Sequence, residues 1–165
     1  MILLKLDGVD GDSNIKNYDK WIACTSSSWN VERTFSESAK AGTQDVNLGV
    51  ADIPPISLNK SFDTASVYLM QCAIAGGALG KEAKIHFLTT GGEKANLYLE
   101  FKLFNPIVAS WGISGDEDER PTEELSLWYW KIWVQYYATK DGKSYTSAGS
   151  KGWDRIKNEP WGGQG

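Results

Sequence analysis

The residues best suited to nucleophilic chemistry are the serine run Ser26–Ser28 and the only histidine, His86. A serine nucleophile needs a base within hydrogen-bonding reach, and His86 lies in the middle of a segment that alternates like a strand. The serines also lack the G-x-S-x-G turn that raises a nucleophile above a sheet. We therefore predict a structural histidine and small polar residues on a strand. An enzyme that pairs Ser28 with His86 remains an alternative that nothing in the spacing favours.

Four consecutive acidic residues, Asp116–Glu119, are the candidate for a metal site. They lack the spacing and the ligand alternation of a calcium-binding EF-hand loop, so a solvated loop is the simpler interpretation. Cys24 and Cys72 lie far apart without C-x-x-C spacing, which predicts two free thiols. The segment "GGALG" is not followed by Lys and Ser or Thr, so it is no phosphate-binding P-loop. We predict no catalytic group, metal or cofactor, and favour a binding or assembly protein.

Length and composition indicate the class of protein. The chain has 165 residues, of which 41% are apolar and 23% charged, as expected for one globular domain spanning 1–165. Its net charge of −4 argues against a nucleic acid as the main partner, because phosphate binding requires a basic patch. Apolar runs are far shorter than the roughly 20 residues that span a bilayer. The N-terminus lacks the basic region and the apolar region of about 7–15 residues that a secretory signal peptide has. We expect neither membrane insertion nor Sec-type export.

Most of the chain alternates apolar and polar residues with period two, which predicts about eight strands. They lie at 1–7, 20–31, 46–60, 83–90, 96–104, 106–114, 124–137 and 151–158. The segment 61–77 instead has apolar residues at helical spacing and ends at two glycines, so it is predicted to be a helix. This pattern predicts an all-β barrel or sandwich with one helix.

The segment 124–137, "ELSLWYWKIWVQYY", is apolar or aromatic on both faces when it is read as one strand. A strand of a soluble monomer normally has one polar face. A contiguous aromatic surface usually marks an interface, so we expect a second protein chain to cover the outer face.

The polar segment 32–45 has no period and is longer than most hairpin loops. We expect an extended loop there that reaches a neighbouring molecule. The tail at about 158–165 is expected to be flexible.

Several segments, taken in order, resemble the Hcp family, the tail-tube protein of bacterial type VI secretion systems. From Leu3 to about Trp153 they are "LKLDGVDGDS", "KWIACTSSSWNV", "ISLNKSFDTASVYLMQCAIAGG", "FLTTGGEKANLYLEFKLFNPIVASWGISG", "RPTEELSLWYWKIWVQY" and a late "GW". The chain departs from the family pattern at Val67, where the family has proline, and at Asn30, which replaces the glycine of S-W-G.

Two family motifs are carried by identifiable residues. The pattern K-x-x-D-x-x-S-P-x-L is matched, apart from its proline, by Lys60, Asp63, Ser66 and Leu69. The pattern P-T-E is intact at 121–123.

The resemblance implies a β-barrel of two antiparallel sheets with one flanking helix. Six copies close into a ring with an open channel, and rings stack into a tube. A contractile sheath expels the tube behind a VgrG-type spike, and small effector proteins travel in the channel. The protein is then cytoplasmic before firing and secreted afterwards, to the medium or to a target cell. It binds no nucleic acid and inserts into no membrane.

In this setting two groups of residues are candidates for function. The subunit-interface candidates are Trp29, Arg33, Phe35, Trp128 and Trp130. The candidates for lining the channel or contacting cargo are Ser26 and Ser28, which share a strand face. For each of these aromatic residues, a purely structural role in the core of its own chain remains the alternative. A phage-like tail-tube protein or a stand-alone β-barrel binding protein remains the alternative function.

Overall fold

Antiparallel strands make up most of this protein. The computed structural model describes residues 1–37, 46–90 and 94–163, without the side chains of residues 35–37, 46–48 and 50. These ranges contain fifteen strands and one helix, which confirms the predicted all-β fold with a single helix. No helix within them is long and apolar enough to cross a lipid bilayer.

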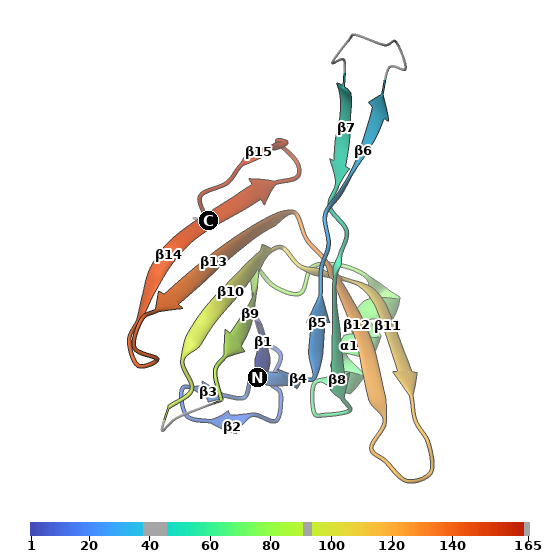
Figure 1. Cartoon of the computed structure of the whole chain (residues 1–165). Helices are drawn as coiled ribbons and strands as arrows, with labels where there is room; N and C mark the ends of the chain where they lie inside the picture. The colour runs from blue at the N-terminus through green and yellow to red at the C-terminus, as the bar shows by residue number, and fades with distance from the viewer. Residues whose placement is uncertain (38–45, 91–93, 164–165) are drawn as a thin grey trace.

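The larger sheet has seven strands in the order β15-β14-β13-β10-β9-β1-β4, and all of its neighbours are antiparallel. Its strands are β1 (Ile2–Leu6), β4 (Ile22–Cys24), β9 (Glu82–Leu88), β10 (Leu97–Phe104), β13 (Lys131–Thr139), β14 (Tyr145–Asp154) and β15 (Glu159–Pro160). It curves around one side of the molecule, with β14 and β15 at the outer end (Figure 1).

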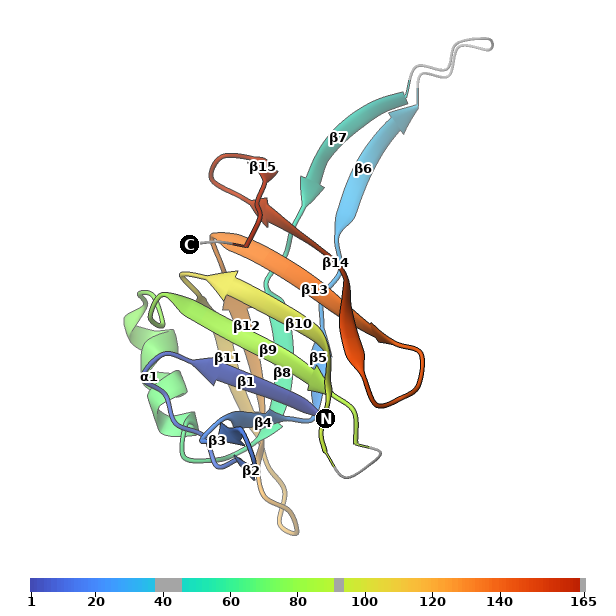
Figure 2. The ribbon, with the colours of Figure 1, turned by 90° about the vertical axis from the view of Figure 1, so that its left-hand side faces the viewer.

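The smaller sheet has four strands in the order β11-β12-β8-β5. They are β11 (Ile107–Ser114), β12 (Thr122–Trp128), β8 (Ile56–Ser61) and β5 (Ser26–Ser28). Two short ladders complete the fold: β2 (Asn14–Ile15) with β3 (Tyr18–Asp19), and β6 (Glu32–Glu37) with β7 (Val46–Asp52). The pair β6–β7 extends well away from the two sheets (Figure 2).

The hydrophobic core lies between the two sheets and the helix α1 (Ser66–Ala75). The larger sheet contributes fully buried Leu4 and Ile85, the smaller sheet contributes Leu58 and Leu125, and the helix contributes Leu69. Each such side chain stabilises the fold by about 1.5–3 kcal/mol relative to an exposed one. Because alternate residues of a strand point to opposite faces, each sheet has a second face that points away from this core.

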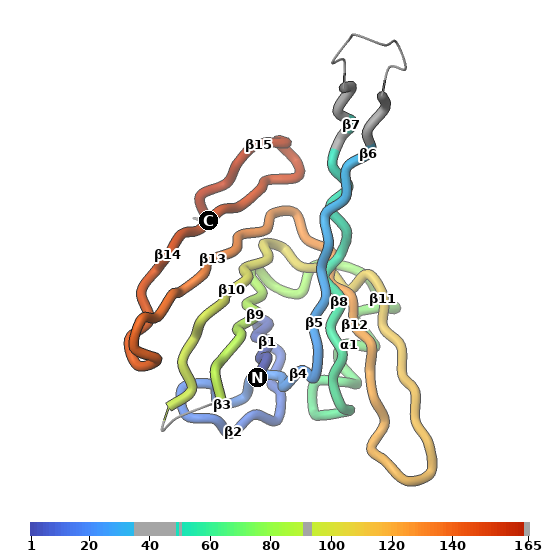
Figure 3. The backbone as a smooth tube through the Cα atoms, viewed as in Figure 1, coloured from blue at the N-terminus to red at the C-terminus, as the bar shows by residue number. Residues whose placement is uncertain are grey.

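Two of the predicted strands each cross from one sheet to the other. The segment 20–31 divides at Thr25, whose backbone N–H and hydroxyl both donate to the carbonyl oxygen of Asn59, at 2.8 and 3.1 Å. The segment 124–137 divides at a corner between β12 and β13, which the backbone trace shows at the upper end of the two sheets, below the β6–β7 hairpin (Figure 3). The chain therefore has more strands than the eight or so predicted. Period-two alternation continues through a corner and does not indicate it.

The segment expected to be an extended loop begins as the hairpin strand β6, and the rest of it, 38–45, lies outside the described residues. In the segment expected to be a flexible tail, β15 pairs with β14, and the N–H of Trp161 donates to the carbonyl oxygen of Gly152 at 3.0 Å. Both cysteines are free thiols, as predicted, and each is partly buried.

Candidate functional site

Below its upper end, where Ile107 and Trp128 lie, the outward face of the four-stranded sheet carries mostly hydroxyl side chains, and we call this part the hydroxyl face. Alternation assigns to it the residues Ser26, Ser28, Ser57, Asn59, Ser61, Ser110, Gly112, Ser114, Thr122, Glu124 and Ser126. All are exposed except Ser57 and Ser126, which are half-buried. The two predicted channel residues, Ser26 and Ser28, lie on this face, on its edge strand β5.

Cross-strand hydrogen bonds hold these side chains in place. The amide nitrogen of Asn59 donates to the Ser26 hydroxyl at 2.8 Å, which joins β8 to β5. The hydroxyls of Ser110 and Ser126 lie 2.6 Å apart and join β11 to β12. Such pairs across a sheet stabilise it and fix its register. The face is therefore polar and ordered, and it offers few apolar groups to a passing molecule.

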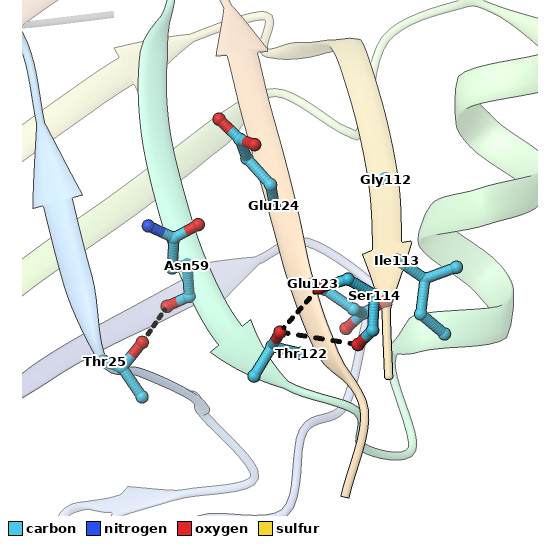
Figure 4. Close-up of a pocket in the computed structure, with 8 residues that line it drawn as sticks. All are labelled: Thr25, Asn59, Gly112, Ile113, Ser114, Thr122, Glu123 and Glu124. Carbon is cyan, nitrogen blue, oxygen red and sulfur yellow. Dashed lines mark hydrogen bonds between the residues drawn. The ribbon is translucent and has the colours of Figure 1, made fainter. Parts of the chain in front are cut away.

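A shallow pocket of about 380 Å³ opens at the lower end of this face (Figure 4). Its lining includes Thr25, Asn59, Gly112, Ser114, Thr122 and Glu124. The Glu124 carboxylate projects from the middle of β12, and Asn59 lies opposite it on β8 (Figure 4). The pocket offers hydroxyl, amide and carboxylate groups for binding. Its lining contains neither an imidazole nor a thiol.

A buried ion-pair network lies directly beneath the hydroxyl face. Lys60 on β8 and Glu123 on β12 point inward, their side chains are 0% and 1% exposed, and they form an ion pair. The Lys60 ammonium also lies 2.8 Å from Asp63 and donates to the Ser66 hydroxyl at 3.0 Å. The Ser66 hydroxyl in turn donates to Glu123 at 2.7 Å. The indole N–H of Trp111 donates to the second oxygen of Glu123, also at 2.7 Å.

This network attaches α1 to the four-stranded sheet. Asp63 accepts the backbone N–H of Ala65 at 3.0 Å just before the helix begins, and Ser66 is its first residue. The helix ends at Gly76, whose positive φ of 71° suits a residue without a Cβ. The motif residues noted in the sequence therefore meet in space. The sequence did not indicate that they form one buried cluster.

Two predicted interface residues, Trp128 and Trp130, lie at the corner between β12 and β13. Their rings pack edge to face with centroids 4.7 Å apart, and the guanidinium of Arg155 lies 4.7 Å from the centroid of the Trp128 ring. Trp128 is half-buried, whereas Trp130 is 37% exposed. The structure thus leaves Trp130 accessible to a partner and places Trp128 behind it.

The other three interface candidates lie on or beside the projecting hairpin. The indole N–H of Trp29 donates to the hydroxyl of Tyr129 at 2.8 Å and the carbonyl oxygen of Pro54 at 3.2 Å, so Trp29 supports the core. Arg33 is exposed and donates to the carbonyl oxygen of Gly49 across the hairpin at 2.9 Å. Phe35 belongs to β6, but its side chain lies outside the described residues.

His86 lies on β9, on the outward face of the larger sheet, and the core separates it from Ser28. Its Nε2 is 3.1 Å from Glu100, and its Nδ1 is 3.4 Å from the hydroxyl of Tyr18. The ring of Trp21 packs against the imidazole with centroids 4.6 Å apart. The structure therefore does not bring Ser28 and His86 together.

The electrostatics of this cluster follow from its contacts. Burial acts to raise the pKa of Glu100, but the hydrogen bond and the charge of His86, with help from Lys102 and Tyr137, bring it below its usual value. Burial and the nearby carboxylate raise the pKa of the Tyr137 hydroxyl, which donates to Glu100 at 3.2 Å. These contacts form a structural cluster that packs the β2–β3 segment onto the sheet.

Comparison with known proteins places the chain in a family. Residues 3–136 match the family described as "Type VI secretion system effector, Hcp". No curated protein sequence gives a match.

Several solved structures share the fold over nearly the whole chain. A structure described as a type six secretion system protein is 26% identical, covers 97% of this chain and 98% of its own, and has a TM-score of 0.87. Hcp1 from Salmonella typhimurium is 21% identical, covers 97% of both chains and has a TM-score of 0.75. A type VI secretion system effector from Yersinia pestis is 20% identical, covers 93% of this chain and 99% of its own, and has a TM-score of 0.69. Since the family match spans most of the chain and the fold agrees, this protein belongs to the Hcp family of type VI secretion systems.

Proposed function

We propose that this chain is the tail-tube subunit of a type VI secretion system. Six copies close into a ring, the hydroxyl faces line its channel, and rings stack into a tube. A contractile sheath expels the tube behind a VgrG-type spike, and small effector proteins travel in the channel. The observation that carries this proposal is the hydroxyl face, an ordered polar surface bounded on each side by an edge strand.

The two edge strands of the four-stranded sheet support ring closure. β5 forms one edge and β11 the other, so the two edges present different backbone groups on opposite sides of the subunit. An edge strand is a ready template for another strand, and a repeated contact between unlike surfaces forms a ring when its rotation divides a full turn. Joining β5 of one copy to β11 of the next would continue the sheet around the channel.

The composition of the hydroxyl face supports its role as the channel lining. Ser26 and Ser28 are exposed on β5, and the face has no large apolar side chain between them and Ser114 on β11. Hydroxyl groups exchange hydrogen bonds with water readily, so a protein in the channel is held weakly and can leave. We assign these two serines to cargo contact on this ground.

The projecting hairpin supports stacking. β6–β7 leaves one end of the four-stranded sheet, and the loop between β11 and β12 lies at the opposite end (Figure 1). Copies stacked along the strand direction would therefore bring the hairpin of one ring to the lower end of the next. We assign Arg33 and Phe35 on β6 to that contact, and Trp128 and Trp130 at the nearby corner to the interface as well. Trp29 packs against the core, so we assign it an indirect role at the interface.

Mass measurement tests the proposal. Size-exclusion chromatography with light scattering should give about six times the chain mass of 18.2 kDa. Replacement of Trp130 by aspartate should yield a folded monomer, because Trp130 is not part of the buried core and an unpaired carboxylate would be costly inside the interface, whereas Trp130→Phe should still assemble. Circular dichroism checks that each variant is folded. A wild-type chain that stays monomeric at every concentration reached would overturn the proposal.

A further inference from the structure

Glu124 is the single ionisable residue of the hydroxyl face. The other ten residues of that face are serine, threonine, asparagine or glycine. Glu124 is exposed, and its carboxylate has no ion pair within 4.0 Å among the parts of the chain that the structure describes. An uncompensated charge on an otherwise neutral surface sets the sign of the potential at that surface.

The immediate neighbours of Glu124 leave this carboxylate open. In the strand register it faces Asn59 on β8 and Gly112 on β11, neither of which is charged. A Cβ added at Gly112 would meet no atom within 4 Å, so the space above Gly112, beside Glu124, is open. The pocket in Figure 4 gives an approaching side chain access to it.

The charge beneath the sheet does not neutralise Glu124. On the other side of the sheet lies Lys60, whose ammonium group already contacts both Glu123 and Asp63. One cation shared by two carboxylates leaves this buried cluster with an excess of negative charge. The exposed loop 116–120, below the pocket, has four carboxylates and one arginine and adds charge of the same sign.

We infer that the channel selects cargo with a cationic, lysine- or arginine-rich surface, and that Glu124 is the residue that makes this selection. This inference rests on the ring proposed above. Closing the ring would bring one Glu124 carboxylate from each subunit into a single belt around the channel. A belt of like charges in a narrow channel attracts counter-charged groups by focusing the field. The neutral hydroxyls around it limit the strength of attachment, so the cargo can still be released.

Peptide binding to assembled rings tests the inference. Two fluorescein-labelled peptides serve as probes: one rich in lysine, and the same sequence with each lysine replaced by glutamate. Anisotropy titrations at low salt should show binding of the lysine peptide only. Glu124→Gln should weaken this binding roughly tenfold, because several weak exposed charge pairs are lost together. High salt should remove the difference between the two proteins.

A matched control separates the channel from the outer surface. Glu159 on β15 is also exposed, lies outside the hydroxyl face and makes a surface ion pair with Lys157 at 3.8 Å. Glu159→Gln removes the same charge and should leave lysine-peptide binding unchanged. Equal binding by rings of the wild type and Glu124→Gln would overturn the inference and leave the tube proposal standing. A wild-type chain that forms no rings would overturn the tube proposal, and the charge belt with it.

Discussion

Replacement of Lys60 by methionine should be among the most destabilising substitutions in this protein. The Lys60 side chain is fully buried and is held by Glu123 and Asp63, whose side chains are 1% and 9% exposed. Methionine retains most of the apolar stem but removes the ammonium group. Two carboxylates then remain in a buried site without a cation. Removing one partner of a buried ion pair costs about 3–5 kcal/mol of unfolding free energy.

Two further variants provide reference values for this loss of unfolding free energy. Glu123→Gln leaves Lys60 with Asp63 at 2.8 Å and keeps an acceptor for the Trp111 indole, so we expect a smaller loss of about 1–3 kcal/mol. Lys84→Met breaks a surface pair with Glu82 at 3.1 Å, in which both side chains are at least one-third exposed, and should cost at most about 1 kcal/mol. The expected order of destabilisation is therefore Lys60→Met, then Glu123→Gln, then Lys84→Met.

Urea unfolding followed by tryptophan fluorescence measures these free energies. All variants need the same protein concentration, because assembly adds to the apparent stability of the folded state. The assembled mass of each variant should be measured alongside. If Lys60→Met costs no more than Lys84→Met, the buried network does not hold α1 on the sheet, and our account of these motif residues is wrong.

Three other predictions follow from single contacts. Burial raises the pKa of the Cys24 thiol from 9.0 to about 12, so its thiolate is about a thousandfold rarer at pH 8. Peptide mass spectrometry should find far slower alkylation of Cys24 in the native protein than in urea, and equal rates would contradict this. The pKa of Glu100 lies below its usual 4.5, so the stability it contributes is complete above pH 4.5 and is lost as the pH falls through the lower folded value. His86→Leu removes the hydrogen bond that lowers this pKa, and the acid-unfolding midpoint should move to higher pH; an unchanged midpoint would count against the pairing. A Cβ at Gly152 would lie 2.5 and 2.7 Å from two backbone oxygens, whereas Gly162 has open space around it. Thermal unfolding should therefore show a loss of about 1–3 kcal/mol for Gly152→Ala and little change for Gly162→Ala.

The features that depend on local periodicity could be predicted from the sequence. The strand predicted at 96–104 is β10, and the helix predicted within 61–77 is α1, which ends at Gly76 as expected. These elements follow from side-chain alternation and from glycine at a helix end, which nearby residues determine.

The corners and the buried network could not be found in the same way. A chain that turns from one sheet to another keeps its alternation, so nothing at Thr25 indicates the crossing. The network joins Lys60 to a residue 63 positions away, and only the fold brings them together. One signal was available: Lys60 follows Ile56 and Leu58 on the same strand face, so alternation places its charge inside the core and implies a buried partner.

The structure also changes the interpretation of the aromatic segment 124–137. At the corner, Tyr129 is fully buried in the core. On the outward face of β13, Trp133 is 8% exposed, because the segment after β15 packs on its ring and the Lys102 ammonium lies 4.7 Å from the ring centroid.

The chain itself therefore covers much of the surface for which the sequence indicated a partner. Among the tryptophans and tyrosines of this segment, only Trp130 and Tyr136 are more than one-third exposed, at 37% and 52%. Aromatic burial in this segment can thus supply only a small part of the association energy. Most of it must come from other surfaces, and the backbone groups of the edge strands β5 and β11 are the candidates that also fix the direction of assembly.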